Sequence, residues 1–224
     1  MIIKAQWIIV VTILITQLHG GGCSVSHYGQ PSVAEGPTES YVAQDNLFSL
    51  TIPQGWLKEE SGFPYDDPNV KTIGLKLIGP YGEYGVKTEI ALLYYQHGGF
   101  FNNYQKYLAM KENSMVRLDD SKTVFSKTMV DGKKGIGFKI RNYKLVIKSG
   151  WTPPPFKEGV IYEIAPPSIQ VKMVEQFIVV PAEEGFFVFH YKTTEESADK
   201  CQDVFLRMIA SLHFNNQKPW QGEK

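Results

Sequence analysis

The sequence predicts an α+β fold, in which a central antiparallel β-sheet is packed by helices. Phe48, Leu50 and Ile52 alternate with polar residues, which is typical of a strand with one buried face. The dipeptide Asp131-Gly132, favoured in two-residue hairpin turns, separates two strand-like runs. Residues 194–211 carry apolar side chains at every third or fourth position, which indicates one buried face of a helix. Sheet and helices together form a layered domain.

The remaining elements follow from the same periodicities. Strands are expected at 48–52, 72–78, 86–95, 123–130, 133–148, 171–180 and 186–192, and helices at 101–114 and 194–211. In the 133–148 strand the apolar residues change parity near Arg141-Asn142, so we expect a bulge or a break there. Thr193-Thr-Glu-Glu196 fits a capping box at the start of the last helix. Lys111 of the first helix is expected to reach water.

Composition excludes several classes of protein. Of the 224 residues, 43% are hydrophobic and 21% are charged, as in an ordinary globular chain. The 23 basic side chains balance 23 acidic ones, so no long-range field would attract nucleic acid, and we expect no nucleic-acid partner. Two cysteines cannot build a disulfide scaffold or a multi-cysteine zinc site.

Residues 1–22 have the pattern of a secretory signal. Lys4 supplies a positive start, an apolar run follows from Trp7 to Ile15, and three glycines stand directly before Cys23. The run is short for a permanent span, which needs about 20 apolar residues.

Small residues before a lone cysteine resemble the lipobox of bacterial lipoproteins. In that family the cysteine thiol receives a diacylglycerol, the signal is cut before it, and the new amine is acylated, with palmitate expected here. The resemblance makes Cys23 the lipidated residue, although Gly20 stands where the family has leucine. A plain signal peptide and an uncleaved anchor remain alternatives. In the family, aspartate after the cysteine favours the inner membrane, so Ser24 favours the outer membrane of the bacterial cell envelope.

Four segments are expected along the chain. After the signal, residues 23–44 form the lipidated N-terminus and a flexible tether, because Gly, Pro and Ser are frequent and no apolar period persists. Residues 45–214 form a single α+β domain, large enough for one core. Residues 215–224 are polar and form a disordered tail.

The two ends of this domain resemble the PsbP-like superfamily, which includes envelope lipoproteins of the DcrB type. The stretch Phe48 to Trp56 is similar to the opening strand and turn, and Val204 to Phe214 to the closing helix and short strand. The resemblance implies an α/β/α sandwich over residues 46–214. Members mostly bind partners or assist assembly, and none of the family's functional motifs maps onto this chain.

Chemistry-bearing motifs are scarce. His97, His190 and His213 lack metal-ligand spacing, and no Gly-x-Ser-x-Gly elbow occurs. His190 lies in an apolar strand, which indicates a hydrogen-bonded core histidine. Cys201 lies on the apolar face of the last predicted helix, which indicates a small core residue. We therefore predict no catalytic residue, no metal and no cofactor.

The connection 149–168 is the candidate binding loop, with Trp151, Phe156 and Tyr162 beside several prolines. The alternative is that these aromatic side chains cover the edge of the sheet.

Together these patterns predict a non-catalytic envelope lipoprotein that presents a binding or assembly domain to an unidentified protein or ligand. A carrier of apolar small molecules or lipids is one alternative, and it needs a cavity of about 300 Å³ or more. An envelope hydrolase is the other, and it needs a base within reach of a nucleophile.

Overall fold

The computed structural model describes residues 37–63, 70, 72–113, 123–148, 150–152 and 166–215. The predicted signal, Cys23, most of the predicted tether, Phe156, Tyr162 and the tail from residue 216 lie outside the described residues.

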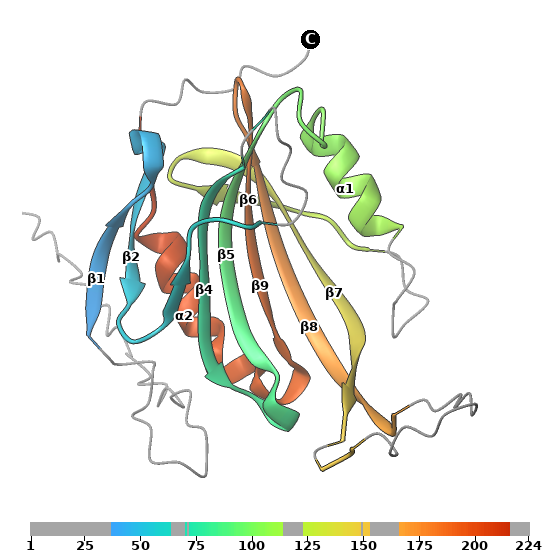
Figure 1. Ribbon diagram of the computed structural model, residues 1–224. Helices are drawn as coiled ribbons and strands as arrows, with labels where there is room; N and C mark the ends of the chain where they lie inside the picture. The colour runs from blue at the N-terminus through green and yellow to red at the C-terminus, as the bar shows by residue number, and fades with distance from the viewer. Residues whose placement is uncertain are drawn as a thin grey trace, which may run out of the picture.

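The centre of the domain is an antiparallel sheet of seven strands (Figure 1). In spatial order these are β3 (Leu57–Glu59), β4 (Ile73–Tyr81), β5 (Lys87–Gln96), β9 (Gly185–Thr194), β8 (Ser168–Pro181), β7 (Lys133–Ile147) and β6 (Ser126–Val130). The middle strand, β9, begins with residues 185–189 buried on both faces, as expected for a strand that is covered on both sides. The predicted α+β class with an antiparallel sheet is confirmed.

One face of the sheet is covered by the C-terminal helix and a second, smaller sheet. Helix α2 (Ala198–Ala210) buries Cys201, Val204, Phe205 and Met208. The small sheet pairs β1 (Thr38–Val42), β2 (Phe48–Pro53) and β10 (His213–Phe214). These elements and the inner face of the large sheet share one apolar core, in which the rings of Phe205 and Tyr191 stack at 5.4 Å. The predicted helical stripe is confirmed, although the helix is shorter than expected.

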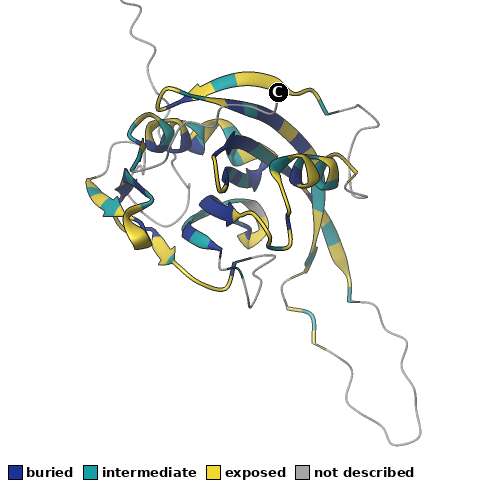
Figure 2. Cartoon of the chain, turned by 90° about the horizontal axis from the view of Figure 1, so that it is seen from above, coloured by how far each residue is buried: buried dark blue, intermediate teal, exposed yellow. Residues whose placement is uncertain are grey.

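Helix α1 (Tyr104–Glu112) crosses the opposite face (Figure 1). Asn103 caps the helix, since its Oδ1 accepts a hydrogen bond from the backbone N–H of Lys106 at 2.9 Å. Tyr107 and the preceding Phe101 are buried against Tyr95 and Phe186. In Figure 2, buried positions lie where the sheet and helices face each other, and exposed positions lie outside.

The ordered domain begins earlier than the sequence indicated. Strand β1 lies within the segment 23–44 predicted as a tether, and the short 3₁₀ turn at Gln44–Asn46 begins at its last residue. β1 runs antiparallel to β2, with Thr38 opposite Pro53 and Val42 opposite Ser49. Its residues alternate between exposed and half-buried, so the apolar signal that would have marked a strand is weak. Strand β3, with two of its three residues exposed, was missed for the same reason.

The bulge expected in β7 is absent. β7 and β8 pair without a register shift from Ile136 opposite Val179 to Ile147 opposite Ser168. The apolar residues of β7 change from even to odd positions for another reason. Strand β8 pairs with β9 only from Met173 onward. Before that point β7 and β8 form a two-stranded arm beyond the main sheet. Leu145 on this arm is therefore 60% exposed instead of buried.

The predicted turn at Asp131-Gly132 is confirmed, and the predicted capping box is wrong. Asp131 and Gly132 both have positive φ angles, 47° and 74°, as the hairpin turn requires. At the start of the last helix, Thr194 makes no capping hydrogen bond, and a 3₁₀ turn at Glu195–Ser197 precedes α2. The hydroxyl of Thr193 instead bonds that of Thr88 at 2.9 Å inside the protein. Among the described residues, no helix has the length and apolar character needed to cross a bilayer.

Candidate functional site

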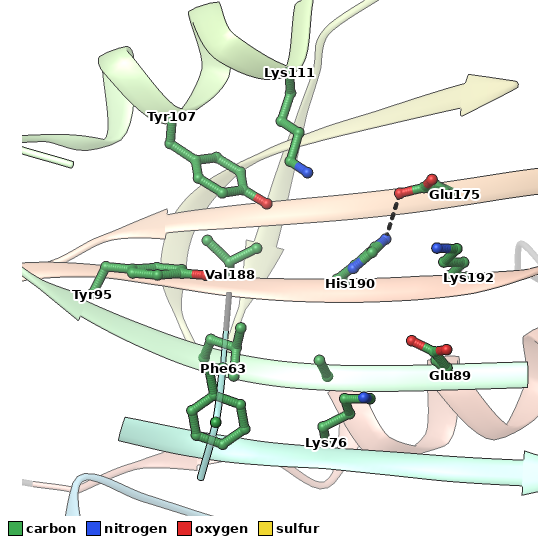
Figure 3. A pocket seen from close by; sticks show the side chains of 13 residues that line it. Phe63, Lys76, Glu89, Tyr95, Tyr107, Lys111, Glu175, Val188, His190 and Lys192 are labelled. Carbon is green, nitrogen blue, oxygen red and sulfur yellow. Dashed lines mark hydrogen bonds and ion pairs between the residues drawn. The ribbon is translucent and has the colours of Figure 1, made fainter. Parts of the chain in front are cut away.

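A pocket of about 340 Å³ opens between the sheet and helix α1 (Figure 3). Strands β4, β5, β8 and β9 form its floor, and α1 and the segment at Gly62-Phe63 form its walls. The lining side chains divide into a charged group and an apolar, largely aromatic group. The charged or protonatable ones are Lys76, Glu89, Lys111, Glu175, His190 and Lys192. The others are Phe63, Ala91, Leu93, Tyr95, Tyr107 and Val188.

Strand register places these two groups at opposite ends of the pocket. Glu89, Lys192 and Glu175 are cross-strand neighbours on β5, β9 and β8. The row two residues earlier on β9 consists of Ala91, His190 and Phe177. The row after that includes Leu93 and Val188. Cross-strand neighbours share one face of a sheet, so the floor passes from charged to apolar along the strands.

Ala91 stands in the middle of the floor, between the longer side chains of Lys76 and His190. Its methyl group leaves space above the sheet where a large side chain would fill it.

A hydrogen-bonded chain of polar side chains marks the charged end. Nε2 of His190 lies 2.8 Å from Oε2 of Glu175, and Nδ2 of Asn142 donates to the other carboxylate oxygen at 2.7 Å. The imidazole ring stacks on Phe177, with ring centroids 4.2 Å apart and an interplanar angle of 8°. Both oxygens of Glu175 are thus engaged within the protein. The expectation of a hydrogen-bonded histidine at position 190 is confirmed.

The two members of this pair titrate differently from free side chains. Burial alone would raise the pKa of Glu175. The hydrogen bonds from His190 and Asn142 and the charges of His190 and Lys192 outweigh burial and lower it to about 2. Burial lowers the pKa of His190, with a further contribution from Lys111 and Lys192, and this outweighs the opposing effect of Glu175. Near neutral pH the pair is therefore an ionised carboxylate beside a neutral imidazole.

Lys111 extends from α1 into the pocket (Figure 3). Its ammonium group lies 5.1 Å from the ring centroid of Phe177 and 5.6 Å from that of Tyr107, within the range of cation–π attraction. Lys111 was expected to reach water, and in the structure the residue is half-buried. Burial lowers its pKa, and the charge of Lys192 adds to that effect, whereas Glu175 opposes it.

The apolar end is built from packed rings. Tyr95 and Tyr107 are both buried, with centroids 5.9 Å apart, and Phe63 closes the other side of the pocket. Tyr107 and Lys111 are four residues apart, so one helix face presents both a phenol and an ammonium group.

The pocket presents an oriented imidazole among charged and aromatic side chains. His190 held by Glu175 is an oriented imidazole of the kind that serves as a base. The described residues that line the pocket include no serine, threonine or cysteine that could act as its nucleophile. In the described part of the chain, no group of three His, Cys, Asp or Glu side chains is placed to hold a metal ion.

Of the three residues of the candidate binding loop, the structure describes Trp151. Trp151 is half-buried and does not line the pocket, and its backbone N–H donates to the carbonyl of Lys148 at 3.4 Å. Phe156 and Tyr162 lie outside the described residues, so the candidate loop stays a prediction. Cys201 is buried on α2, as expected.

Comparison with known proteins adds little about the site. No family model matches the sequence, and no curated protein matches it. Similar solved structures include cyanobacterial PsbP (CyanoP) from Synechocystis, with 10% identity, 85% of this chain and 99% of that chain covered, and a TM-score of 0.43. LpqN, involved in cell envelope biogenesis of Mycobacterium tuberculosis, has 10% identity, 80% and 85% coverage, and a TM-score of 0.32.

A protein of unknown function from Pseudomonas aeruginosa is similar over 77% of this chain and 93% of that chain, at 8% identity and a TM-score of 0.37. All three TM-scores lie below 0.5.

Proposed function

We propose that the chain is a lipid-anchored protein of the bacterial cell envelope whose domain binds a small molecule beneath helix α1 without converting it. The observation that carries the binding function is the pocket itself. It combines oriented polar groups at one end with aromatic side chains at the other, as ligand sites do.

A wholly apolar ligand fits this pocket poorly. Such a molecule would remove water from the lysine and glutamate side chains at the charged end without replacing their hydrogen bonds, which is costly. The volume of about 340 Å³ satisfies the size that a carrier needs, but it lies at the low end for ligand pockets, which span about 300–1,000 Å³. A small ligand with one polar end is therefore favoured over a lipid.

Binding can be tested by filling the pocket. Ala91→Leu adds three carbon atoms to the middle of the floor, and Leu206→Ala on the far helix α2 provides a variant that leaves the pocket untouched. We expect native mass spectrometry of protein purified gently from envelope extracts to show a bound small molecule with the wild-type chain and with Leu206→Ala. The Ala91→Leu chain should be free of it. A pocket that is empty in all three, or equally occupied in all three, contradicts the binding function.

The anchor is proposed from the order of signal, Cys23 and tether in the sequence. Globomycin, which blocks cleavage of lipoprotein signals, should make a larger precursor accumulate. A Cys23→Ala variant should leave the membrane fraction, with Cys201→Ala as the matched control. Unchanged processing, or a Cys23→Ala chain that stays anchored, would refute lipidation.

The chain's two cysteines allow a second check. A disulfide between Cys23 and Cys201 would consume the thiol that the lipid requires, so the two states exclude each other. The intact mass of the mature chain should therefore carry the added mass of the lipid and remain unchanged by reducing agent.

A further inference from the structure

We infer that the two-stranded arm of β7 and β8, residues 143–147 and 168–172, docks on an anionic lipid bilayer. Leu145 and Ile147 enter the boundary between headgroups and acyl chains, and the basic side chains around them lie on lipid phosphates. This membrane-binding surface of the folded domain is separate from the pocket and from the proposed lipid anchor.

The arm extends past the part of the sheet that neighbouring strands cover. β8 pairs with β9 only from Met173 onward, and β6 pairs with β7 only as far as Gly137. Within the described ranges, no further strand pairs with either strand of the arm. Figure 1 shows the two strands running on together beyond the end of β9, and Figure 2 shows most of their residues there as exposed or intermediate. The arm is therefore accessible to a partner surface.

One face of the arm is apolar and exposed. Tyr143, Leu145 and Ile147 alternate along β7, so their side chains share a face. Tyr143 is half-buried, whereas Leu145 and Ile147 are 60% and 54% exposed. The cross-strand neighbours on the same face are polar and exposed, namely Lys172, Gln170 and Ser168. Two large aliphatic side chains therefore stand together in water on a projecting ribbon, where a partner could remove them from it.

The charge of the arm indicates the chemistry of that partner. Residues 139–148 and 168–172 include five basic side chains and no acidic one, although the whole chain has no net charge. All five are exposed, and they are Lys139, Arg141, Lys144, Lys148 and Lys172. Glu195 lies 3.7 Å from Nε of Arg141 and 3.7 Å from Nζ of Lys172, so two of these cations share one carboxylate. The arm stays positive and is complementary to a surface of lipid phosphates.

The order of side chains along β7 fits the layers of a bilayer. Arg141, Tyr143 and Leu145 follow one another on one face, so this face changes from cationic through aromatic to aliphatic. Six residues separate Arg141 from Ile147, which is about 20 Å at the usual rise of a strand. A bilayer offers phosphates, an interface that favours aromatic rings, and acyl chains in the same order. An acidic protein surface would match the charges but not this change in polarity.

Two further lysines can follow the aliphatic side chains into the interface. Lys144 and Lys148 are the sequence neighbours of Leu145 and Ile147. A lysine stem can lie along apolar surface while its ammonium group reaches back to the phosphates. The contact is shallow, because the outer edges of the arm carry backbone groups that no described strand pairs, and such groups do not enter hydrocarbon. Affinity should therefore depend on apolar burial and on charge together.

Vesicles of two compositions test the lipid surface. The chain from Ser24 onward keeps every described residue and lacks Cys23, so no lipid anchor contributes. Co-sedimentation compares vesicles of pure phosphatidylcholine with vesicles that contain about one third phosphatidylglycerol. We expect at least about tenfold stronger binding to the anionic vesicles, and weaker binding as salt is raised from about 0.1 to 0.5 M.

Variants of the apolar pair locate the contact on the arm. Leu145→Thr combined with Ile147→Thr should weaken binding to anionic vesicles at least about tenfold, while threonine keeps the strand propensity. Leu57→Thr combined with Met129→Thr is the matched control, because these side chains on β3 and β6 are comparably exposed but lie outside the arm. The control should bind as the wild-type chain does.

Variants of the charges follow the same design. Lys144→Gln combined with Lys148→Gln should also weaken binding to anionic vesicles at least about tenfold, because each lysine near such a surface contributes to attraction. Lys127→Gln combined with Lys134→Gln removes two exposed charges at the opposite end of β7 and should leave binding unchanged. Thermal unfolding shows whether each variant is folded, and the comparison of vesicles with the wild-type chain does not depend on any variant.

Three results would overturn the inference. The first is equal binding, or no binding, of the wild-type chain to the two kinds of vesicle. The second is unchanged vesicle binding by both variants of the arm. The third is a dimer in sedimentation velocity that Leu145→Thr with Ile147→Thr abolishes, without vesicle binding, which would make a second copy of the chain the partner. None of these bears on processing at Cys23, so the lipid anchor is tested separately.

Discussion

Replacing Phe205 with alanine should destabilise the domain by about 3–5 kcal/mol, which is the usual cost of removing a fully buried phenylalanine. The side chain has no exposed surface and stacks on Tyr191 at the centre of the core between α2 and the sheet. The loss combines the transfer free energy of the ring with the cavity that it leaves. It is a large share of the 5–15 kcal/mol by which typical domains are stable.

Urea unfolding at pH 7 of the chain from Ser24 onward measures this cost. The adjacent Leu206 is an apolar control on the same helix, since its side chain is 45% exposed and points away from the core. Leu206→Ala, and likewise Arg207→Ala at the next exposed position, should change the free energy of unfolding by no more than about 0.5 kcal/mol. Equal midpoints for Phe205→Ala and Leu206→Ala would refute the packing of α2 on the sheet and the layer order of the fold.

Two further outcomes are expected from the pocket and from the arm of β7 and β8. The pKa of Glu175 is about 2 in the folded chain against 4.5 for the free side chain, so its stabilisation, about 3 kcal/mol, is complete above pH 4.5 and lost as the pH falls to 2. The difference in unfolding free energy between wild type and Glu175→Gln, measured by urea unfolding at several pH values, should therefore shrink below pH 4.5, and a constant difference would show that the carboxylate is not held in this way. Leu145→Thr should shift the free energy of unfolding by no more than about 0.5 kcal/mol, because Leu145 is exposed on the arm. A loss of 2 kcal/mol or more would indicate the buried position that a bulged β7 would give it.

The sequence predicted a helix or turn correctly where a single local pattern defines that element. The stripe from Cys201 to Leu212 predicted α2 and its buried face, because a helix that covers a core needs apolar residues at that spacing. Asp131-Gly132 predicted its turn, because few residue pairs accept two positive φ angles in succession. From these elements the α+β class could be predicted before any contact was known.

Short strands and edge strands could not be predicted from the sequence. β1 and β3 bury little, so their residues lack a strong alternation, and pairing with a neighbouring strand stabilises them. The change of parity in β7 was read as a bulge because the sequence does not reveal that β8 continues past the end of β9.

The pocket was decided by the tertiary structure alone. Lys76, Lys111, Glu175 and His190 are separated by up to 114 positions in the chain and share no motif. Strand register brings three of them onto one face of the sheet, and α1 places the fourth above it. Local periodicity determines which face of an element is buried, whereas the pairing of distant strands determines which charges meet. That is the physical reason why the layers of this protein could be predicted from its sequence and its pocket could not.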